Sequence, residues 1–172
     1  FGAYFVIKVF VPLDSAALSM GADEVAVAIV QCAASQGLDV TLIRTGSRGM
    51  LWLEPLVEVE TSSGRIGFAN ISTEAVPELI KSGALETGSH KSSIGLVEEH
   101  DFFKNQNRVT FARVGVIDPL SISDYESHGG LVGLRKAIEM TATDVVSEVT
   151  ASGLRGRGGA GFPAGIKWQT VL

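Results

Sequence analysis

The stretch Ser152–Trp168 constrains the fold most, because six glycines fall between positions 153 and 165. A glycine inside a helix or strand costs about 0.5–1 kcal/mol relative to alanine, so this density predicts a loop. Without Cβ atoms, the main-chain N–H groups of such a loop can approach a ligand closely. The same stretch carries three cations and two aromatic side chains, namely Arg155, Arg157, Lys167, Phe162 and Trp168. Main-chain donors, cations and flat apolar surface together suit a phosphate-bearing nucleotide or flavin.

Residues 156–161 match the pattern G-x-G-x-x-G, which leaves several interpretations open. A Rossmann site needs a strand just before the pattern and an acidic residue about 20 residues later. Here the preceding residues 144–150 have a helical pattern, and the sequence given ends at Leu172. An RGG-type nucleic-acid segment is usually long and basic, whereas this one is short and lies in an acidic chain. A purely structural glycine loop would leave the three cations unexplained.

The net charge of −5 argues against a nucleic acid or an anionic membrane as the main partner. No apolar run approaches the roughly 18 residues of a membrane helix, and Phe1–Phe10 lacks the basic region and cleavage site of a signal peptide. Cys32 is the single cysteine, so no disulfide forms within the chain. We expect a cytoplasmic protein with no nucleic-acid and no membrane partner. The first residue is Phe and the last follows the glycine loop closely, so we also expect a piece of a longer protein.

The first half of the chain predicts an α/β fold. The order strand-helix-strand, strand-strand, helix is the thioredoxin-like layout. Within the first helix, Val25, Ile29 and Cys32 share one face, so the thiol is expected to pack in the core. The expected strands are 4–11, 38–43, 56–60 and 65–70, and the expected helices are 23–36 and about 72–82.

The second half begins with a segment rich in Gly, Ser and charge, which predicts a linker at residues 89–100. Val109–Val114 then predicts a strand. Residues 130–140 predict a helix with Leu131, Leu134 and Ile138 facing inward, and Thr143 is the expected cap of the helix that leads into the glycine loop. The three histidines are scattered, so no metal site is expected.

Taken whole, the stretch Ser152–Trp168 resembles the flavin- and NADH-binding loop of NADH-oxidising flavoprotein subunits. These subunits occur in complex I, in NAD-reducing hydrogenases and in NAD-dependent formate dehydrogenases. The preceding segment is also similar, with Phe-x-x-Gln-x-Arg ending at Arg108 and Gly-x-x-Asp-Pro ending at Pro119. The resemblance implies an α/β domain that binds FMN and NAD, and residues 101–172 would form its N-terminal part. It also implies hydride exchange between the two cofactors without a catalytic side chain.

The resemblance also implies which residues bind the cofactors: Gly156, Arg157, Gly158, Gly159, Ala160, Gly161, Phe162 and Lys167. The residues from Gly156 to Gly161 would line the flavin and the nucleotide, Phe162 would stack on the adenine, and Lys167 would reach the flavin phosphate. Family members often carry a second aromatic residue shortly after this lysine, where the chain has Gln169–Val171. A [4Fe–4S] centre is expected only beyond Leu172.

A second resemblance covers Thr45–Val59, which is similar to the cluster-binding turn of thioredoxin-like [2Fe–2S] ferredoxins. Ser47 and Leu51 stand at the positions of the Cys-x-Gly-x-Cys ligands. Iron–sulfur clusters normally need four thiolates, and Cys32 alone cannot supply them. We therefore expect residues 1–88 to form a thioredoxin-like domain without a cluster, serving in docking.

This combination most resembles the beta (diaphorase) subunit of NAD-dependent molybdenum or tungsten formate dehydrogenases. The implied partners are the catalytic molybdenum or tungsten subunit and a small [2Fe–2S] thioredoxin-like subunit, with electrons passing between iron–sulfur centres, FMN and NAD. One alternative is the flavoprotein subunit of an NAD-reducing hydrogenase or of an NADH:quinone oxidoreductase. Another is a non-catalytic docking module that has lost its cofactor.

Overall fold

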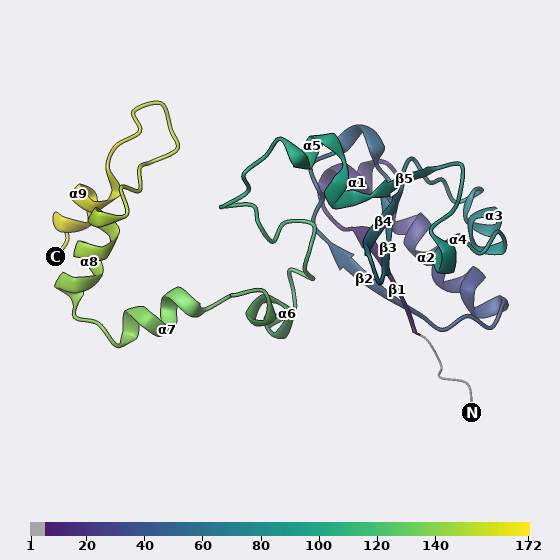
Figure 1. Ribbon diagram of the computed structural model, residues 1–172, viewed down its shortest axis with the longest axis horizontal. Helices are drawn as coiled ribbons and strands as arrows, with labels where there is room; N and C mark the ends of the chain where they lie inside the picture. The colour runs from purple at the N-terminus through teal and green to yellow at the C-terminus, as the bar shows by residue number, and fades with distance from the viewer. Residues whose placement is uncertain (1–5) are drawn as a thin grey trace. The chain divides into compact units, whose positions relative to one another are not determined.

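The computed structural model describes residues 6–172 and divides the chain into two compact units (Figure 1). The first unit ends at Asp124, and the second comprises Tyr125–Leu172. Tyr4 and Phe5, which the sequence places at the start of the first strand, lie outside the described residues.

A five-stranded sheet with the order β2-β1-β3-β4-β5 forms the centre of the first unit. β1 runs parallel to β2, and the remaining neighbours are antiparallel. The strands are β1 (Ile7–Pro12), β2 (Val40–Thr45), β3 (Val57–Thr61), β4 (Gly64–Phe68) and β5 (Ser93–Leu96). The β1-α2-β2 unit followed by the β3-β4 hairpin and α3 (Val76–Lys81) confirms the predicted α/β, thioredoxin-like layout.

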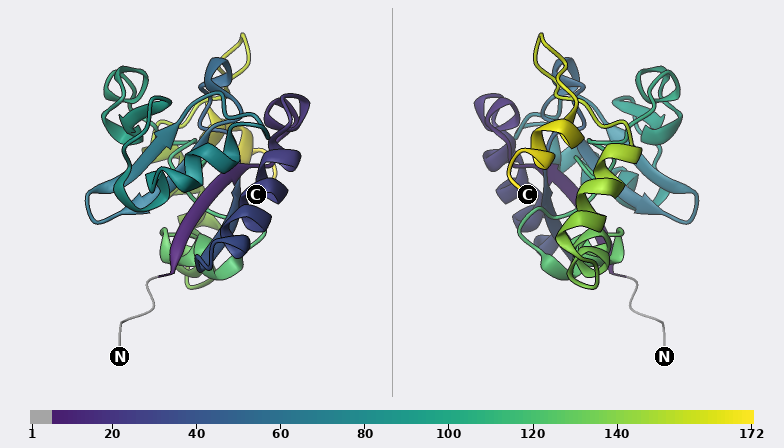
Figure 2. Two further views of the ribbon diagram at one scale, coloured as in Figure 1. Left: turned by 90° about the vertical axis from the view of Figure 1, so that its right-hand side faces the viewer. Right: turned by 90° about the vertical axis from the view of Figure 1, so that its left-hand side faces the viewer.

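The main core lies between the sheet and helix α2 (Ala22–Ser35), which runs alongside β1 in the left view of Figure 2. Val25 and Ile29 of α2 are fully buried against residues such as Val9 and Phe68. Burial of each such side chain stabilises the fold by about 1.5–3 kcal/mol. Cys32 packs against this core from the same helix, which confirms the prediction of a packed thiol.

Short helices complete both units. In the first unit they are α1 (Ser15–Ser19), η1 (Leu51–Leu53), α4 (Ala84–Thr87), η2 (Val97–Glu99) and α5 (Asp101–Lys104). At the boundary and in the second unit they are α6 (Ile122–Ser127), α7 (Val132–Ile138), α8 (Ala142–Ala151) and α9 (Ala164–Gln169). None of the helices in the described part of the chain combines the length and the apolar character that a membrane span needs.

A second hydrophobic cluster shows that residues 89–100 are not a linker, contrary to the sequence-based expectation. β5 pairs with β4 through Leu96 opposite Ile66, and the following Val97 is fully buried. Val97 packs with Met50 and Leu56, and the rings of Phe102 and Phe103 lie against them. The Gly, Ser and charged residues that indicated a linker thus surround a short apolar run, which pairs with the edge of the sheet as β5 and continues into the buried Val97.

The strand predicted at Val109–Val114 is wrong. These residues form turns closed by local hydrogen bonds, such as Val114 N–H to Phe111 O (3.1 Å). Val109 and Phe111 are exposed. A β-branched run forms a strand only where a neighbouring strand accepts its hydrogen bonds, and the sheet pairs this segment with none of its described strands.

Two expectations for the second unit also need correction. Leu134 and Ile138 of α7 are exposed, and Leu131 is only half-buried. Helix α8 is capped by Thr141 rather than by Thr143. Thr141 has extended backbone geometry, and its Oγ1 accepts a hydrogen bond from the Asp144 N–H (3.2 Å), as an N-cap requires.

A buried carboxyl group gives the first unit a testable pH dependence. Glu54 is 2% exposed; its carboxylate accepts hydrogen bonds from Ser47 Oγ (2.9 Å) and from the Leu56 N–H (2.9 Å). Burial raises the pKa of Glu54 above its ordinary value, and the two hydrogen bonds only partly oppose this. The folded state therefore holds the proton more tightly than the unfolded state does.

We predict that Glu54→Gln removes a loss of stability that the wild type suffers as the pH rises. A raised folded pKa stabilises the fold below the unfolded pKa of Glu54, and this contribution disappears as the pH rises through the folded pKa. Urea unfolding between about pH 4 and pH 8 should show the wild type losing free energy of unfolding relative to Glu54→Gln. The exposed Glu86→Gln is the control. Parallel curves for wild type and Glu54→Gln would contradict the prediction.

Candidate functional site

The glycine-rich stretch forms a loop that joins α8 to α9 and is tied together at its base (Figure 1). Arg155 and Pro163 form an antiparallel bridge across the two arms of the loop. The Gly156 N–H donates to Phe162 O (2.8 Å), and the Ala164 N–H donates to Leu154 O (2.8 Å). Residues 154–156 and 162–164 therefore form a hydrogen-bonded stem, and residues 157–161 form the short tip of the loop.

Close packing of α8 against α9 supports this stem. Gly165 is buried, and a Cβ at this position would lie 2.6 Å from Thr150 Cα and closer still to its Oγ1. Only glycine allows this approach. The Thr150 hydroxyl in turn donates to Val146 O (2.8 Å). Thr150 was not among the predicted site residues, although a glycine inside a short helix is a signal that two backbones meet.

The glycines of the loop differ in what requires them. Gly153 and Gly161 have positive φ values of 66° and 52°, which favour glycine, and Gly165 is required by packing. Gly158 and Gly159 have no positive φ, and a Cβ on either would meet nothing within 4 Å. Nothing in the described chain therefore requires glycine at these two positions. A ligand that approaches the main chain closely would require it, because a Cβ would keep the ligand away.

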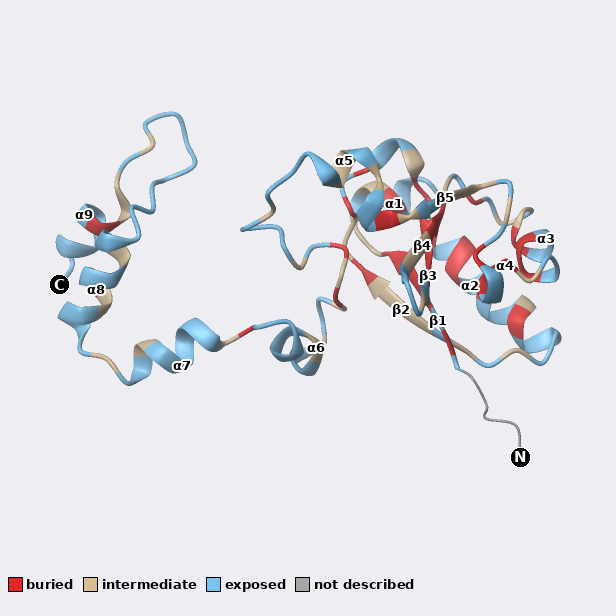
Figure 3. Cartoon of the chain, viewed as in Figure 1, coloured by how far each residue is buried: buried red, intermediate tan, exposed pale blue. Residues whose placement is uncertain are grey.

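The tip of the loop also presents main-chain donors without partners. The N–H groups of residues 157–160 make no hydrogen bond within the part of the chain that the structure describes. Every residue from Ala151 to Ala160 is exposed, as the pale blue loop in Figure 3 shows. Successive unpaired N–H groups form a concave donor set that suits an anion such as a phosphate.

Positive charge beside these donors is uncompensated. Arg155, Arg157 and Lys167 form no ion pair with any described residue. The other two cations of the second unit, Arg135 and Lys136, are both paired with glutamates. In this unit, the positive charges away from the loop are thus paired with glutamates, and those on or next to the loop are available to a ligand.

The aromatic side chains of the stretch are accessible as well. Phe162 is 54% exposed and Trp168 is 45% exposed, which leaves flat apolar surface open to a ring. All eight predicted site residues lie on the loop or, for Lys167, on the helix that follows it. The structure brings them onto one element, and their roles in binding stay a prediction.

The turn that resembles a cluster-binding site has different chemistry here. Ser47 Oγ donates to Glu54 and accepts from the Gly49 N–H (3.0 Å), while Leu51 begins η1 and is exposed. Neither side chain supplies a thiolate, and Cys32 packs in the main core. These residues do not fit an iron–sulfur cluster. In residues 6–172, no group of three or more His, Cys, Asp or Glu side chains could hold a metal ion.

Comparison with known proteins identifies homologues among redox enzyme subunits, although no family model matches the chain. The HndC subunit of the NADP-reducing hydrogenase of Solidesulfovibrio fructosivorans is 54% identical over 69 residues, which cover 40% of this chain and 14% of that protein. The NADH-quinone oxidoreductase F subunit of Streptomyces coelicolor is 57% identical over 47 residues, covering 27% of this chain and 10% of that protein. The corresponding F 2 subunit of Rhizobium meliloti is 50% identical over 64 residues, covering 37% and 15%. The matched residues thus span no more than 15% of the length of these relatives.

Solved structures similar to the chain include the thioredoxin-like [2Fe–2S] ferredoxin from Aquifex aeolicus. It is 18% identical with a TM-score of 0.42, and the match covers 50% of this chain and 86% of the ferredoxin. A crystal structure of the wild-type ferredoxin gives a TM-score of 0.43 at 18% identity, covering 52% and 97%. The assignment of the fold rests on the strand order and pairing of this chain itself.

The contact between Gly165 and Thr150 yields a second prediction. Gly165→Ala should force α8 and α9 apart, because the new Cβ has no room beside Thr150. Overpacking of this kind typically destabilises by about 1–3 kcal/mol, which urea unfolding of the full chain would measure. Gly133→Ala in α7 is the matched control, since a Cβ there meets nothing within 4 Å. A Gly165→Ala protein as stable as the wild type would refute the close packing.

Proposed function

From the homology to hydrogenase and NADH-quinone oxidoreductase subunits, we propose that this chain is part of an oxidoreductase subunit that binds FMN and NAD(H). The observation that carries the proposal is the loop tip, where Gly158 and Gly159 are not required by the fold and four consecutive N–H groups lack partners. The proposed site consists of Gly156–Phe162 and Lys167. We also propose that the protein acts in the cytoplasm.

The residues present fit a flavin mononucleotide and a dinucleotide. Both ligands carry phosphate groups, which match the unpaired N–H groups and the free charges of Arg157 and Lys167. The exposed ring of Phe162 offers a stacking surface for the adenine of NAD(H). If FMN is bound there, it would supply the redox chemistry, namely hydride exchange with NAD(H) and transfer of single electrons.

The contribution of this chain is therefore binding and orientation. Glycines at the loop tip admit the ligands to main-chain distance, and the N–H donors and cations offset the charge of the phosphates. The stem at Arg155–Pro163 and the contact between Gly165 and Thr150 close the base of the loop, which restricts the arrangements that the donors at its tip can adopt. No side chain of the loop is assigned a role as acid or base.

For the electron partner, we propose the catalytic subunit of a molybdenum- or tungsten-dependent formate dehydrogenase, together with a small [2Fe–2S] thioredoxin-like subunit. The support is the thioredoxin-like unit with Ser47 and Leu51 in place of thiolates. A [4Fe–4S] centre would belong to sequence beyond Leu172. The names of the relatives favour, at least as strongly, a second candidate in which the chain serves an NAD(P)-reducing hydrogenase or an NADH-quinone oxidoreductase.

Purification of the full-length protein with its native partners distinguishes these candidates. Flavin absorbance of the purified protein tests the cofactor first, since a docking module without cofactor would show none. Reduction of NAD or NADP is then assayed with formate and with hydrogen as donor, and NADH oxidation with a quinone as acceptor. Turnover with formate alone supports the first candidate, and turnover with hydrogen or quinone supports the second.

The cations of the site give a third prediction. Arg157→Ala combined with Lys167→Ala should weaken FMN binding by roughly tenfold or more, because contacts between a charged donor and a phosphate are lost. FMN occupancy of the full-length protein after gel filtration measures the loss. The matched control is Arg135→Ala with Lys136→Ala, which removes the same charge from paired residues of α7. Equal flavin occupancy in both double variants would remove the assigned roles.

The glycines of the loop tip give a fourth prediction, one that separates binding from folding. Gly159→Ala should leave thermal stability unchanged or slightly higher, because its φ is not positive and its Cβ would lie in open space. The same change should weaken FMN or NADH binding, measured by fluorescence titration of the full-length protein. Gly161→Ala provides the contrast, since its positive φ should disturb the loop itself. Unaltered binding in Gly159→Ala would contradict the proposed role of the loop tip in binding.

A further inference from the structure

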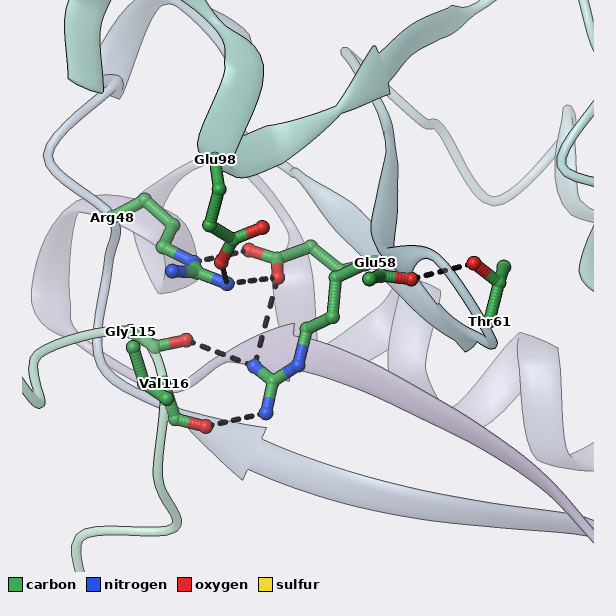
Figure 4. A network of polar contacts seen from close by, with 8 residues as sticks. Arg48, Glu58, Thr61, Glu98, Gly115 and Val116 are labelled. Atoms are coloured by element: carbon green, nitrogen blue, oxygen red, sulfur yellow. Dashed lines mark hydrogen bonds and ion pairs between the residues drawn. The ribbon is translucent and has the colours of Figure 1, made fainter. Parts of the chain in front are cut away.

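A buried carboxylate in the first unit holds two arginines. Glu58 lies on β3 and is 2% exposed, and Arg48 is 3% exposed. Arg48 donates from Nε to Glu58 Oε1 (2.8 Å) and from Nη2 to Oε2 (2.7 Å), and its Nη2 also lies 3.0 Å from Glu98 Oε1 (Figure 4). A charge this deeply buried is tolerated only when it is paired and hydrogen-bonded, so the positions of these side chains are closely defined.

The second arginine, Arg65, uses the same carboxylate as a support. It projects from β4, and its Nη1 lies 3.6 Å from Glu58 Oε2. The guanidinium carbon lies 3.4 Å from the centroid of the Phe10 ring, a cation–π contact with β1. The planar fork of an arginine held on both sides in this way presents its remaining N–H groups in a fixed direction.

Those N–H groups bind the main chain about 50 residues further along. Arg65 Nη1 donates to Gly115 O (3.2 Å), and Nη2 donates to Val116 O (2.6 Å). Figure 4 shows both carbonyls turned toward the network around Glu58. Two parallel hydrogen bonds from one charged group to adjacent carbonyls form a specific and strong contact.

The segment that Arg65 binds, residues 105–121, is here called the strap. It contains no helix or strand, and the hydrogen bonds within it are local turns, such as Val116 N–H to Arg113 O (3.0 Å). Gly115 has a φ of +80°, and a Cβ there would lie 2.5 Å from Arg48 Cδ. Glycine at this position therefore lets the strap lie directly on the arginines.

We propose that Arg65 is a clamp that fixes the strap on the sheet, and with it the point at which the chain leaves the first unit. A segment without ladder hydrogen bonds would otherwise open easily, as loops generally do. The clamp gives the connection to residues 125–172 a defined starting point instead of a flexible one. The proposal does not depend on the proposed function, because it concerns only contacts within residues 6–124.

Hydrogen exchange of the full chain, followed by mass spectrometry, tests the clamp in Arg65→Lys. This change keeps the charge but loses the fork, so the amides of Val116 and Ile117 should exchange roughly tenfold faster, with β1 and β3 unchanged. Arg44→Lys is the matched control. Arg44 also donates to two main-chain carbonyls, those of Val11 (3.1 Å) and Pro12 (2.9 Å), and makes none of its contacts with the strap.

Two results would overturn the proposal: unchanged exchange of the strap in Arg65→Lys, or equally faster exchange of strap and sheet. The second result would make Arg65 an ordinary stabilising residue.

A change on the strap side covers the case in which Arg65→Lys does not fold. Gly115→Ala should release the strap while leaving the sheet residues intact, and trypsin should then cleave after Arg113 faster than in the wild type. Gly95→Ala is its control, because Gly95 also has a positive φ (75°) but a Cβ there would meet nothing within 4 Å. Equal cleavage in both glycine variants and the wild type would contradict the clamp.

Discussion

The carboxylate of Glu58 is the group on which the first unit depends most. It lies in the interior strand β3, and through Arg48, Arg65 and Glu98 it connects the turn after β2, the hairpin partner β4 and the 3₁₀ helix η2. Removing one partner of a buried ion pair typically costs about 3–5 kcal/mol, a large share of the roughly 5–15 kcal/mol that stabilise a domain. The apolar core packs α2 against the sheet, whereas this network attaches the segments around Arg48, Glu98 and Gly115 to it.

The same distinction between fastened and free groups separates the two ends of the glycine loop. At the stem, Gly165 and Gly161 serve the fold, through packing on Thr150 and through a positive φ. At the tip, nothing in the described chain requires glycine at positions 158 and 159, and the N–H groups of both residues are unpaired. A loop needed only as a connection would not require glycine at positions of ordinary φ with open space around them, so the tip is the part on which selection for a ligand would act.

Sequence patterns located most elements of the first unit because each pattern had its physical partner nearby. The β-branched run of β1 pairs with β2 and β3, and α2 shows its acidic first turn and buried face. The pattern at Val109–Val114 failed because strand propensity does not reveal whether a neighbouring strand exists. β5 was missed because composition hides a four-residue strand. The glycine loop was located from sequence, but sorting its glycines required φ values and the distances that a Cβ would meet.

The turn around Ser47 shows how a loop is held without a cluster. A cluster ties distant loops together through metal–thiolate bonds, and here three weaker interactions converge on neighbouring residues: the hydrogen bond of Ser47 to Glu54, the pair of Arg48 with Glu58, and the burial of Met50. Because the Ser47 hydroxyl donates to Glu54, a cysteine introduced at position 47 would lose this hydrogen bond without creating the other thiolates that a cluster needs. What the first unit shows is geometry: a five-stranded sheet and loops fastened to it by buried polar contacts.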